Sequence, residues 1–537
     1  MKKIAQFTGK ETIEIFRTAE GVPYIEAKNH NDLYMAMGYC HAMDRGLQML
    51  LMRILGRGEA SEFLDSTDEL LKIDIFFRRM NFFSKTDQEL SKLTLEAKMS
   101  CTSYCDGVNL FFSKRIPWEF RLLNYSPSPW KIEDSILISR MIGYLTLAQT
   151  QFEIERLLIE MIKAGLSHEK LEELFPGLLG ELDEELIKKV NISGSIVPPE
   201  IKWGGLVPRV MASNNWVISG KKTKSGYPIL ANDPHLETNR LPNVWNELIL
   251  KIKERYAFAS TMPGLPGILL GRTNNLAWGA TYTFMDTIDS WIEDCKEGKY
   301  LKEDGNWIPF KKRNEIIKRK KKENFETIFY ENEHGVLEGD PNITGFYFTT
   351  RWAPSGSGAQ SINNIFKMWD AKNVEEGMKY LGNIETSWNW VLADKEGNIG
   401  YQMSGMMPKR KKGTSGFVPL PGWKPENSWS GFVPPEEFPR IINPEKGYFI
   451  TANNNLNPYG NVAPINICMS SYRAERIERL LEKSSDFTIQ DNFKIHYDVY
   501  SIQAERFMKI IKPLLPDTQP GKILKEWDLC YLPESEG

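Results

Sequence analysis

A change of periodicity along the chain constrains the fold most. Before about residue 185, apolar residues recur mainly at the spacing of amphipathic helices, whereas from residue 213 they alternate over short stretches as strands do. We expect helices at 31–64, 86–114, 131–172, 472–483 and 488–511. We expect two short strands around a turn at 12–28, and further strands near 216, 227, 245, 276, 327, 346, 389 and 399. The pattern predicts a mainly helical first third and a β-rich region after it.

A polar, broken segment at residues 175–212 separates the two regions. It contains Pro176-Gly177, the acidic stretch Glu181–Glu185 and Pro198-Pro199, which disfavour regular structure. We interpret it as a surface linker or a removable spacer. The expected division is a mainly helical region at 1–185, a spacer at 186–212 and a β-rich region at 213–537.

The composition narrows the functional classes. The chain has 537 residues, of which 41% are hydrophobic, enough to bury a large core. A formal net charge of −3 argues against a nucleic-acid partner. The basic run at 311–322 alternates with apolar residues, so we interpret it as the solvated face of a hairpin. The six cysteines include no Cys-x-x-Cys pair, which argues against a zinc or dense disulfide framework.

The sequence carries no evident targeting signal. Met1 to Ala5 is basic, but no apolar stretch follows it, and the chain has no apolar span of 18 residues. We therefore expect no membrane association and, for the sequence as given, a cytoplasmic protein, although a trimmed sequence would look the same.

The segment Met211-Ala-Ser-Asn-Asn-Trp-Val-Ile-Ser-Gly220 carries the strongest chemical signal. Ser213 follows a small residue and leads into a strand-like run, as at a site where a precursor cuts itself. A serine at a new N-terminus carries both a hydroxyl and an α-amine. Because a free α-amine titrates near pH 8, it can act as a base at neutral pH. One residue can then supply both halves of an activated nucleophile.

Several further motifs, in order along nearly the whole chain, resemble the penicillin acylase family of N-terminal nucleophile hydrolases. This family includes cephalosporin acylases and acyl-homoserine-lactone acylases. The similarity is carried by Gly21-Val-Pro-Tyr-Ile-Glu-Ala27, Gly38-Tyr-Cys-His-Ala-Met-Asp-Arg45, Ser213-Asn-Asn-Trp216, Asn232-Asp-Pro-His235, Gly264-Leu-Pro-Gly267, Asn275-Leu-Ala-Trp-Gly279, Trp388-Asn-Trp-Val-Leu-Ala-Asp394, Gly397-Asn-Ile-Gly-Tyr401, Thr451-Ala-Asn-Asn454 and Arg473-Ala-Glu-Arg-Ile477.

The resemblance implies a fold of the α/β (α+β) class. We expect a four-layer αββα sandwich of two stacked antiparallel sheets between helices, with the helical N-terminal region wrapped around the catalytic region. Family members usually extend well beyond the position that corresponds to Gly537, so we expect this sequence to be truncated within a domain.

The resemblance assigns Ser213 as the nucleophile, released by cleavage of the Ala212–Ser213 bond. The polar segment before it resembles the family's excised spacer, and the uncleaved precursor should be inactive because its nitrogen is an amide. His235 lies where cephalosporin acylases carry a histidine. It is expected to hydrogen-bond the Ser213 amine and hydroxyl and to tune proton transfer.

Attack on an amide places negative charge on the carbonyl oxygen, which needs fixed hydrogen-bond donors. By resemblance, these donors are the backbone N–H of Tyr282 and the side-chain amide of Asn389. Arg410 matches the family arginine that helps to hold this asparagine and the substrate. Asn454 lies in a motif near the family site, and the sequence assigns it no role.

The family also binds a structural Ca²⁺ that bridges its two chains. Hard cations take carboxylate and carbonyl oxygens. The resemblance implies Glu153 as the ligand from the helical region, and Asp286, the Ile288 carbonyl and Asp289 as ligands from the β-rich region. No organic cofactor is implied.

These assignments predict an autoprocessing amidohydrolase that forms an α/β heterodimer from one precursor. Its substrate would be a small-molecule linear amide of the penicillin or N-acyl type. Gly143, Leu147 and Leu236 occupy positions that line the family's acyl pocket, and their apolar character favours an aliphatic or aromatic acyl group. Two alternatives stay open: an acyl-homoserine-lactone or fatty-acyl amide acylase, and an unprocessed homologue that binds amides without catalysis.

Overall fold

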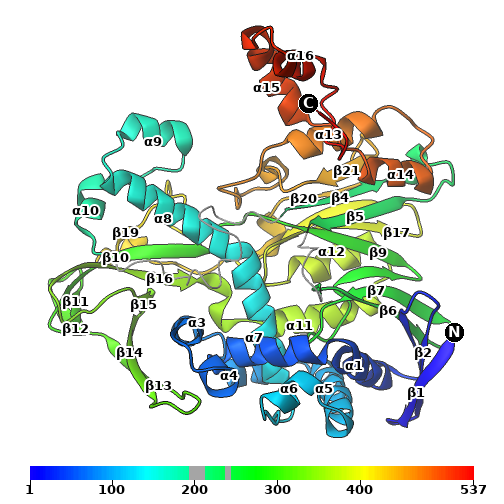
Figure 1. Ribbon diagram of the computed structural model, residues 1–537, viewed down its shortest axis with the longest axis horizontal. Coiled ribbons are helices and arrows are strands. Elements are labelled where there is room, and N and C mark those ends of the chain that lie inside the picture. Colours follow the sequence, from blue (N-terminus) through cyan, green and yellow to red (C-terminus); the bar gives the residue numbers. More distant parts are fainter. Residues whose placement is uncertain (193–211, 236–242, 537) are drawn as a thin grey trace.

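The computed structural model describes residues 1–192, 212–235 and 243–536 (Figure 1). A large sheet forms its centre, with strand order β1-β2-β3-β6-β7-β8-β9-β17-β18-β20. Neighbouring strands are antiparallel except β3 and β6, which are parallel. The strands are β1 (Lys2–Thr8), β2 (Thr12–Arg17), β3 (Pro23–Ala27), β6 (Asn246–Ile252), β7 (Arg255–Thr261), β8 (Leu270–Thr273), β9 (Leu276–Tyr282), β17 (Trp388–Asp394), β18 (Ile399–Ser404) and β20 (Arg440–Ile442).

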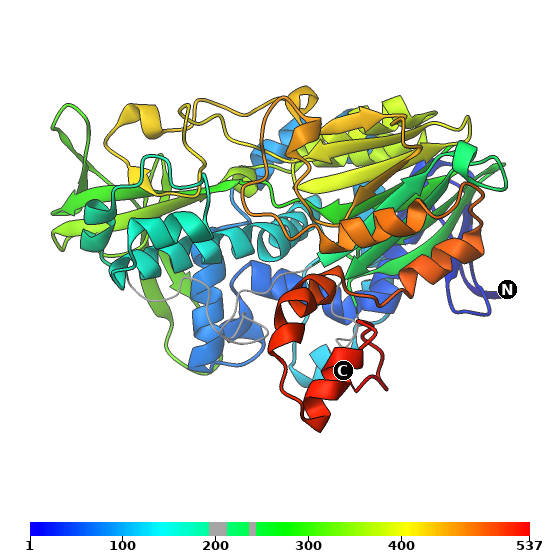
Figure 2. The same cartoon turned by 90° about the horizontal axis from the view of Figure 1, so that it is seen from above.

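A three-stranded antiparallel sheet packs against this large sheet. Its order is β21 (Tyr448–Thr451), β4 (Ala212–Ile218), β5 (Ile229–His235). Strands β4 and β5 lie on β9 and β17, so the start of β4 falls between the two sheets. Figure 2 shows this stack, with the C-terminal orange helices on its outer face.

Helices cover both outer faces of the stacked sheets. On the large sheet lie α1 (His30–Gly56), which packs on β3 and β6, and α12 (Val374–Gly382), which packs on β17 and β18. On the small sheet, α13 (Tyr472–Leu481) packs against β21 and α14 (Ile489–His496) against β5. The expected αββα sandwich is confirmed.

Strand β17 shows why these residues form the centre of the sandwich. All of its seven residues are buried, as expected for a strand covered on both faces. Trp390 and Leu392 point into the core shared with α1 and α12, whereas Val391 and Ala393 point into the core between the sheets. Because side chains alternate along a strand, Asn389 shares the inter-sheet face with Val391.

The remaining helices lie mainly in the first third of the chain, as the sequence predicts. They are α2 (Ala60–Phe63), α3 (Asp68–Met80), α4 (Thr86–Lys92), α5 (Leu95–Lys114), α6 (Trp118–Leu122), α7 (Ile132–Gly143), a π-helical turn at Tyr144–Ala148, α8 (Gln149–Lys163), α9 (His168–Leu174) and α10 (Glu184–Lys189), with α11 (Ala359–Ile365), α15 (Ile502–Ile511) and α16 (Gln519–Glu526) later in the chain. No helix of the described residues has the length and apolar character to span a lipid bilayer.

A third sheet extends sideways from the sandwich, at the left of Figure 1. It runs in the order β12-β11-β10-β16-β15-β14-β13, with β19 paired to β10. Its strands are β10 (Ile288–Lys296), β11 (Lys299–Leu301), β12 (Trp307–Pro309), β13 (Lys311–Ile317), β14 (Phe325–Asn332), β15 (Gly335–Leu337), β16 (Gly345–Trp352) and β19 (Leu420–Pro421).

The predicted basic hairpin is confirmed, but part of its basic run is not solvated. Strands β13 and β14 pair along their length. Arg313 donates to the carbonyl of Arg78 at 2.9 Å, and Lys320 donates to the carbonyl of Leu123 at 3.1 Å. Arg319 donates to the carbonyl of Ser66 at 2.7 Å. These cations fasten the hairpin to the helical region.

The start of the proposed spacer is packed structure. Helix α10 continues to Lys189, and the Val190 backbone pairs with Phe346 of β16. Ile187 and Val190 are buried. Residues 193–211 of the spacer lie outside the described residues.

Candidate active site

Ser213 lies at the start of β4, between β21 and β5, and only 3% of its surface is exposed. Its backbone is continuous with Ala212. The hydroxyl Oγ donates a hydrogen bond to the Ala212 carbonyl oxygen at 2.6 Å. The hydroxyl therefore lies against the peptide bond that self-cleavage would break.

The nitrogen of Ser213 is held by the side chain of Asn453. It donates to Asn453 Oδ1 at 2.7 Å, and Asn453 Nδ2 donates to the Tyr282 carbonyl at 2.9 Å. Asn453 has a φ of 63°, in the left-handed region that asparagine tolerates better than most residues. This turn after β21 is what points the amide at Ser213.

Arg473, in the first turn of α13, completes this arrangement. Its Nη1 donates to the Ser213 carbonyl and to Asn214 Oδ1, both at 2.6 Å. Its Nη2 donates to Asn453 Oδ1 at 2.8 Å and to the Ala452 carbonyl at 2.7 Å. Burial lowers the pKa of Arg473 to about 10, so the guanidinium stays charged at neutral pH. A cation in the first turn opposes the helix dipole, so these contacts must compensate for its position.

Asn453 and Arg473 are the site residues that sequence reasoning did not assign. Both lie in motifs that carry the family resemblance, which was the available signal. The neighbouring Asn454 instead accepts a hydrogen bond from the Ala452 N–H at 3.0 Å within the turn. The three consecutive asparagines could not be told apart without the backbone conformation of the turn.

The structure brings the predicted oxyanion residues next to this cluster. Asn389 is fully buried, and its Nδ2 lies 3.1 Å from the Tyr282 carbonyl and 3.3 Å from Thr281 Oγ1. Its Oδ1 accepts a hydrogen bond from the Tyr401 hydroxyl at 2.8 Å, which fixes the orientation of the amide. The Tyr282 carbonyl thus receives amide donors from both Asn389 and Asn453, which ties the two asparagines to one point of β9.

His235 is placed differently from the expectation. Its Nε2 lies 2.9 Å from Asp233 Oδ2 and 3.2 Å from Asn214 Nδ2. Asn214 and Ser213 are consecutive on β4, so their side chains point to opposite faces of the sheet. The predicted hydrogen bond from His235 to the Ser213 amine or hydroxyl is not formed in this uncleaved chain. His235 is linked to the site only indirectly: it contacts Asn214, and Arg473 donates a hydrogen bond to Asn214 Oδ1.

Two histidines surround Asp233. His496 Nδ1 of α14 lies 3.8 Å from Asp233 Oδ2, on the carboxylate that His235 also contacts. Hydrogen bonds, mainly the one with His235 and secondarily the one with His496, hold the pKa of Asp233 well below its usual range. The carboxylate is therefore ionised at neutral pH.

Arg410 lies away from Asn389, in contact with the predicted calcium ligands. Its Nε and Nη2 donate to the Asp289 carboxylate at 2.8 and 2.7 Å, and Nη2 also donates to the Asp286 carbonyl at 3.1 Å. Burial opposes its charge, yet the acids at 286 and 289 hold the pKa of Arg410 above its usual value. The predicted contact with Asn389 is wrong for this structure, because the guanidinium is committed to these two acids.

The calcium ligands that resemblance implies do not converge on a cation site. Asp289 Oδ2 also accepts the indole N–H of Trp429 at 2.5 Å, so three N–H donors already surround its carboxylate. Asp286 Oδ2 accepts from Asn466 Nδ2 at 2.7 Å, and Glu153 Oε1 accepts from Gln149 at 3.0 Å. As they are arranged, these residues do not fit a bound calcium ion.

An apolar pocket of about 80 Å³ lies at the start of β17, on the face of the large sheet that carries Trp388. It is lined by residues of α7, the loop before β8, α11 and the start of β17, among them Ile142, Met262, Leu265, Leu269, Ile362 and Trp388. The Trp388 ring packs 5.0 Å from the ring of Tyr282. A side chain at Gly143 would meet Thr386 of this lining. The Leu147 and Leu236 side chains lie outside the described residues.

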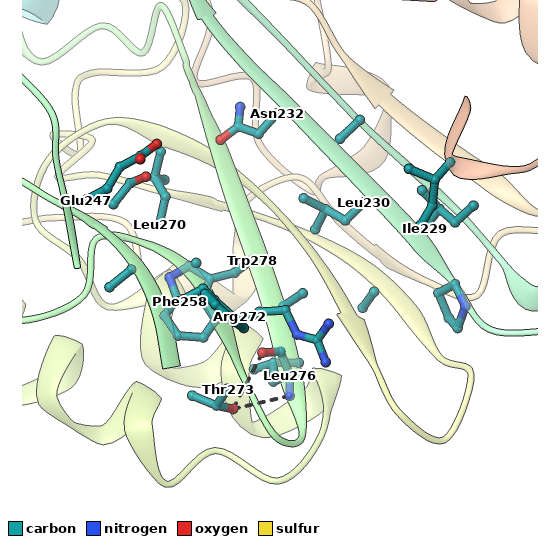
Figure 3. A pocket seen from close by; sticks show the side chains of 18 of the residues that line it. Ile229, Leu230, Asn232, Glu247, Phe258, Leu270, Arg272, Thr273, Leu276 and Trp278 are labelled. Atoms are coloured by element: carbon teal, nitrogen blue, oxygen red, sulfur yellow. Dashed lines mark hydrogen bonds between the residues drawn. The ribbon is translucent and has the colours of Figure 1, made fainter. Parts of the chain in front are cut away.

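A larger groove of about 1220 Å³ opens between β5 and the face of β6–β9 (Figure 3). Ile229 and Leu230 line it on one side, and Phe258 and Trp278 on the other. Asn232 closes the end near the site: its Nδ2 donates to the Asn214 carbonyl at 3.2 Å and to the Ala280 carbonyl at 3.0 Å. This side chain fastens the small sheet to the large one beside Ser213.

An αββα sandwich with a buried serine at the start of an inner strand is the architecture of the N-terminal nucleophile hydrolases. The chain belongs to the penicillin amidase family, whose profile ("Penicillin amidase") matches residues 12–537. It is 29% identical to the acyl-homoserine lactone acylase QuiP of Pseudomonas aeruginosa, over 92% of this chain and 61% of the relative. It is also 29% identical to the penicillin acylase 2 proenzyme of Pseudomonas sp. strain SE83, over 96% of this chain and 69% of that protein.

A solved structure shows the same fold. The thermostable penicillin G acylase from Alcaligenes faecalis matches with a TM-score of 0.53 and 21% sequence identity, over 60% of each chain. The chain spans roughly 58% to 69% of the length of the curated relatives that it matches over most of its own length.

Proposed function

We propose that this protein is an autoprocessing amidohydrolase that cleaves linear amides, R–CO–NH–R′, with Ser213 as its nucleophile. The observation that carries the proposal is the pair of contacts at Ser213. Its hydroxyl lies 2.6 Å from the oxygen of the Ala212 carbonyl, and its nitrogen lies 2.7 Å from Asn453 Oδ1. The same residue is thus positioned for cleavage before processing and for amine-assisted catalysis after it.

In the processing step, Ser213 Oγ attacks the Ala212 carbonyl carbon. The bond between that carbon and the Ser213 nitrogen breaks, an ester to Oγ forms, and the hydroxyl proton passes to the nitrogen. Water then hydrolyses the ester, which leaves a carboxylate on Ala212 and a free amine and hydroxyl on Ser213. Asn453 holds the nitrogen in place throughout, because its Oδ1 accepts an N–H from an amide or from an amine equally well.

In catalysis, Ser213 Oγ attacks the substrate carbonyl and its proton passes to the new α-amine, directly or through water. Negative charge develops on the carbonyl oxygen. By family resemblance, the Asn389 amide and the Tyr282 N–H donate hydrogen bonds to this oxygen. The hydrogen bond from Asn389 Nδ2 to Thr281 Oγ1 is long, at 3.3 Å, so it is the one that the substrate oxygen would replace. The amine product leaves with a proton, and water releases the acid from the acyl-enzyme.

Two features support an uncharged acyl group. The pocket beside Trp388 is lined mainly by Ile, Leu and Met side chains, and Gly143 packs closely against Thr386 of its lining. The family includes acylases of penicillins and of acyl-homoserine lactones, as the names of the relatives state. An aliphatic or aromatic acyl chain fits this lining, and a charged acyl group would bury its charge without a partner.

We further propose that processing yields an α/β heterodimer whose two parts are joined by side chains rather than by calcium. Gln151 of α8 donates to Asn466 Oδ1 at 2.9 Å, and Asn466 donates to Asp286. Arg410 supplies the positive charge that Asp286 and Asp289 require. This chain of contacts crosses from the helical region to the β-rich region.

The first test is direct. Purified protein is examined by denaturing electrophoresis, intact mass and N-terminal sequencing. We expect a fragment that starts at Ser213 and hydrolysis of acyl amides with apolar acyl chains, including acyl-homoserine lactones and phenylacetyl amides. A chain that stays intact and binds these amides without turnover would instead support a non-catalytic homologue.

A further inference from the structure

A second serine lies in a hydrogen-bonded arrangement that nucleophilic catalysis requires, far from Ser213 in sequence. Ser428 follows the 3₁₀ turn at Pro425–Asn427, and its Oγ lies 2.9 Å from His334 Nε2. His334 Nδ1 lies 2.8 Å from Glu293 Oε1. Glu293 is fully buried and His334 is 3% exposed, whereas Ser428 is half-buried and so reachable from solvent.

The surroundings of Glu293 decide which nitrogen of His334 carries the proton. Glu293 Oε1 accepts hydrogen bonds from Asn332 Nδ2 and from Thr349 Oγ1, each at 2.8 Å, in addition to His334. A carboxylate that receives three donors at one oxygen acts as an acceptor, so Nδ1 of His334 carries the hydrogen. Nε2 then presents its lone pair to the Ser428 hydroxyl. This is the tautomer that a general base needs.

Packing fixes the imidazole ring in this orientation. The ring stacks on Trp291 with centroids 4.7 Å apart and an interplanar angle of 14°. The Trp291 indole N–H donates at 2.9 Å to the carbonyl of Asn427, the residue before Ser428. One tryptophan therefore positions both the base and the turn that carries the hydroxyl.

A cation lies beside the serine–histidine pair. The Arg351 guanidinium lies 4.7 Å from the ring centroid of Trp429, the residue after Ser428. Its Nη1 also reaches the carbonyl of Glu333, the residue before His334, at 3.4 Å. Arg351 thus contacts one residue next to Ser428 and one residue next to His334.

We propose that Ser428, His334 and Glu293 form a second nucleophilic site, which takes small activated acyl esters and phosphonyl fluorides. Ser428 Oγ attacks the ester carbon or phosphorus, and its proton passes to His334 Nε2. The leaving alkoxide or fluoride takes that proton, and Oγ keeps the acyl or phosphonyl group. Glu293 stabilises the imidazolium that forms between these steps. The site shares no residue with the cluster around Ser213.

The test uses the full chain with Ser213→Ala, so that the amide site cannot react and its failure cannot be confused with this one. The protein is treated with an alkyl phosphonyl fluoride, and the adduct is located by peptide mass spectrometry. We expect one adduct on Ser428, lost in the additional variant Ser428→Ala. The matched control is Ser430→Ala, because Ser430 lies two residues on, exposed and bound to the Lys409 carbonyl. This control should label at the unchanged rate.

The role of the histidine is tested by rate. We expect His334→Gln to slow labelling at least tenfold, since removal of the base leaves an ordinary hydroxyl. Because this variant could disturb folding, its unfolding in denaturant is compared with that of the Ser213→Ala chain. No adduct in the folded Ser213→Ala chain, an adduct at another residue, or an unchanged labelling rate in a folded His334→Gln variant would overturn the proposal.

Discussion

Two neighbours bind Ser213: Asn453 contacts its nitrogen, and Arg473 contacts its carbonyl oxygen. Asn453 Oδ1 accepts from this nitrogen, and Arg473 binds both that oxygen and the Ser213 carbonyl. If the chain is cleaved as proposed, the nearby guanidinium should disfavour protonation of the new amine, because two positive charges would then lie close together.

The nucleophile assignment predicts the effect of two substitutions at one position. Ser213→Ala removes the hydroxyl that attacks the Ala212 carbonyl, so the chain should stay intact and should hydrolyse no amide. Ser213→Cys keeps a nucleophile and can still process while it hydrolyses amides poorly. Intact mass and an acyl-amide assay measure both. Turnover retained in the alanine variant would exclude this serine as the nucleophile.

The contact between Arg473 and Ser213 predicts how substitution of Arg473 changes the pH dependence of kcat/KM. Arg473→Gln removes a positive charge next to the Ser213 amine, so the pKa of that amine should rise. A raised pKa leaves less free base at a given pH, and the acidic limb of the kcat/KM profile should move upward by about one pH unit. The profile is measured on processed protein.

Arg476→Gln is the control for Arg473→Gln. Arg476 lies on the same helix and binds Asp498, away from Ser213. Its substitution should leave the profile in place. An acidic limb that does not move in the Arg473 variant would show that this guanidinium does not act on the amine.

At the scale of single residues, the sequence was informative where a motif names one position. Ser213, Tyr282 and Asn389 are gathered by β4, β9 and β17 as the motifs predict. His235 and Arg410 are in the expected motifs, but their side chains contact other partners. Side-chain alternation along the strand separates His235 from Ser213, and two buried acids bind Arg410 away from Asn389. Neither effect can be read from the spacing of the residues in the sequence.

The crossing of α1 and α5 shows how one element constrains another. A Cβ at Gly107 would lie 1.8 Å from the Met35 carbonyl oxygen, and a Cβ at Gly38 would lie 2.1 Å from the Tyr104 carbonyl oxygen. The two backbones approach so closely only because both positions are glycine. This crossing supports the helical layer that covers β3 and β6.

Gly107→Ala should therefore separate the two helices or strain their backbones. We expect the free energy of unfolding to fall by about 1–3 kcal/mol, the usual cost of overpacking. Denaturant unfolding of the full chain measures it. Thr102→Ala, on the exposed side of α5, is the control and should change stability by less than about 0.5 kcal/mol. Equal stability of the two variants would contradict the close packing.

Elements with a clear local period were predictable, and their arrangement was not. The helices of the first third and the basic hairpin follow from periodicity, because hydrophobic spacing acts within one element. The sideways sheet did not, since β10 pairs with β16 and β19 across long stretches of chain. The same holds for the basic run, whose partners Arg78, Leu123 and Ser66 lie in distant parts of the helical region.

At the scale of the whole molecule, one charged cluster of the β-rich region is linked to the helical region, because Gln151 of α8 donates to Asn466 and Asn466 donates to Asp286. Arg410, Asp286 and Asp289 are nearly buried, so each carboxylate depends on the guanidinium for its charge balance. If the chain is processed at Ala212–Ser213 as proposed, this link would act beside the pairing of β3 with β6 and the packing of α1 on β6, which also join the two parts.

If Arg410 serves in place of a metal, chelation should have no effect. We expect EDTA to leave the unfolding temperature of the protein unchanged. Arg410→Met should lower stability by about 3–5 kcal/mol, because it leaves buried carboxylates without a cation, and millimolar Ca²⁺ should restore part of the loss. Lys411→Met, whose lysine pairs with Glu181 at the surface, is the control and should respond to neither. A drop of several degrees on chelation of the unaltered protein would place a metal at these acids and would leave Arg410 another role.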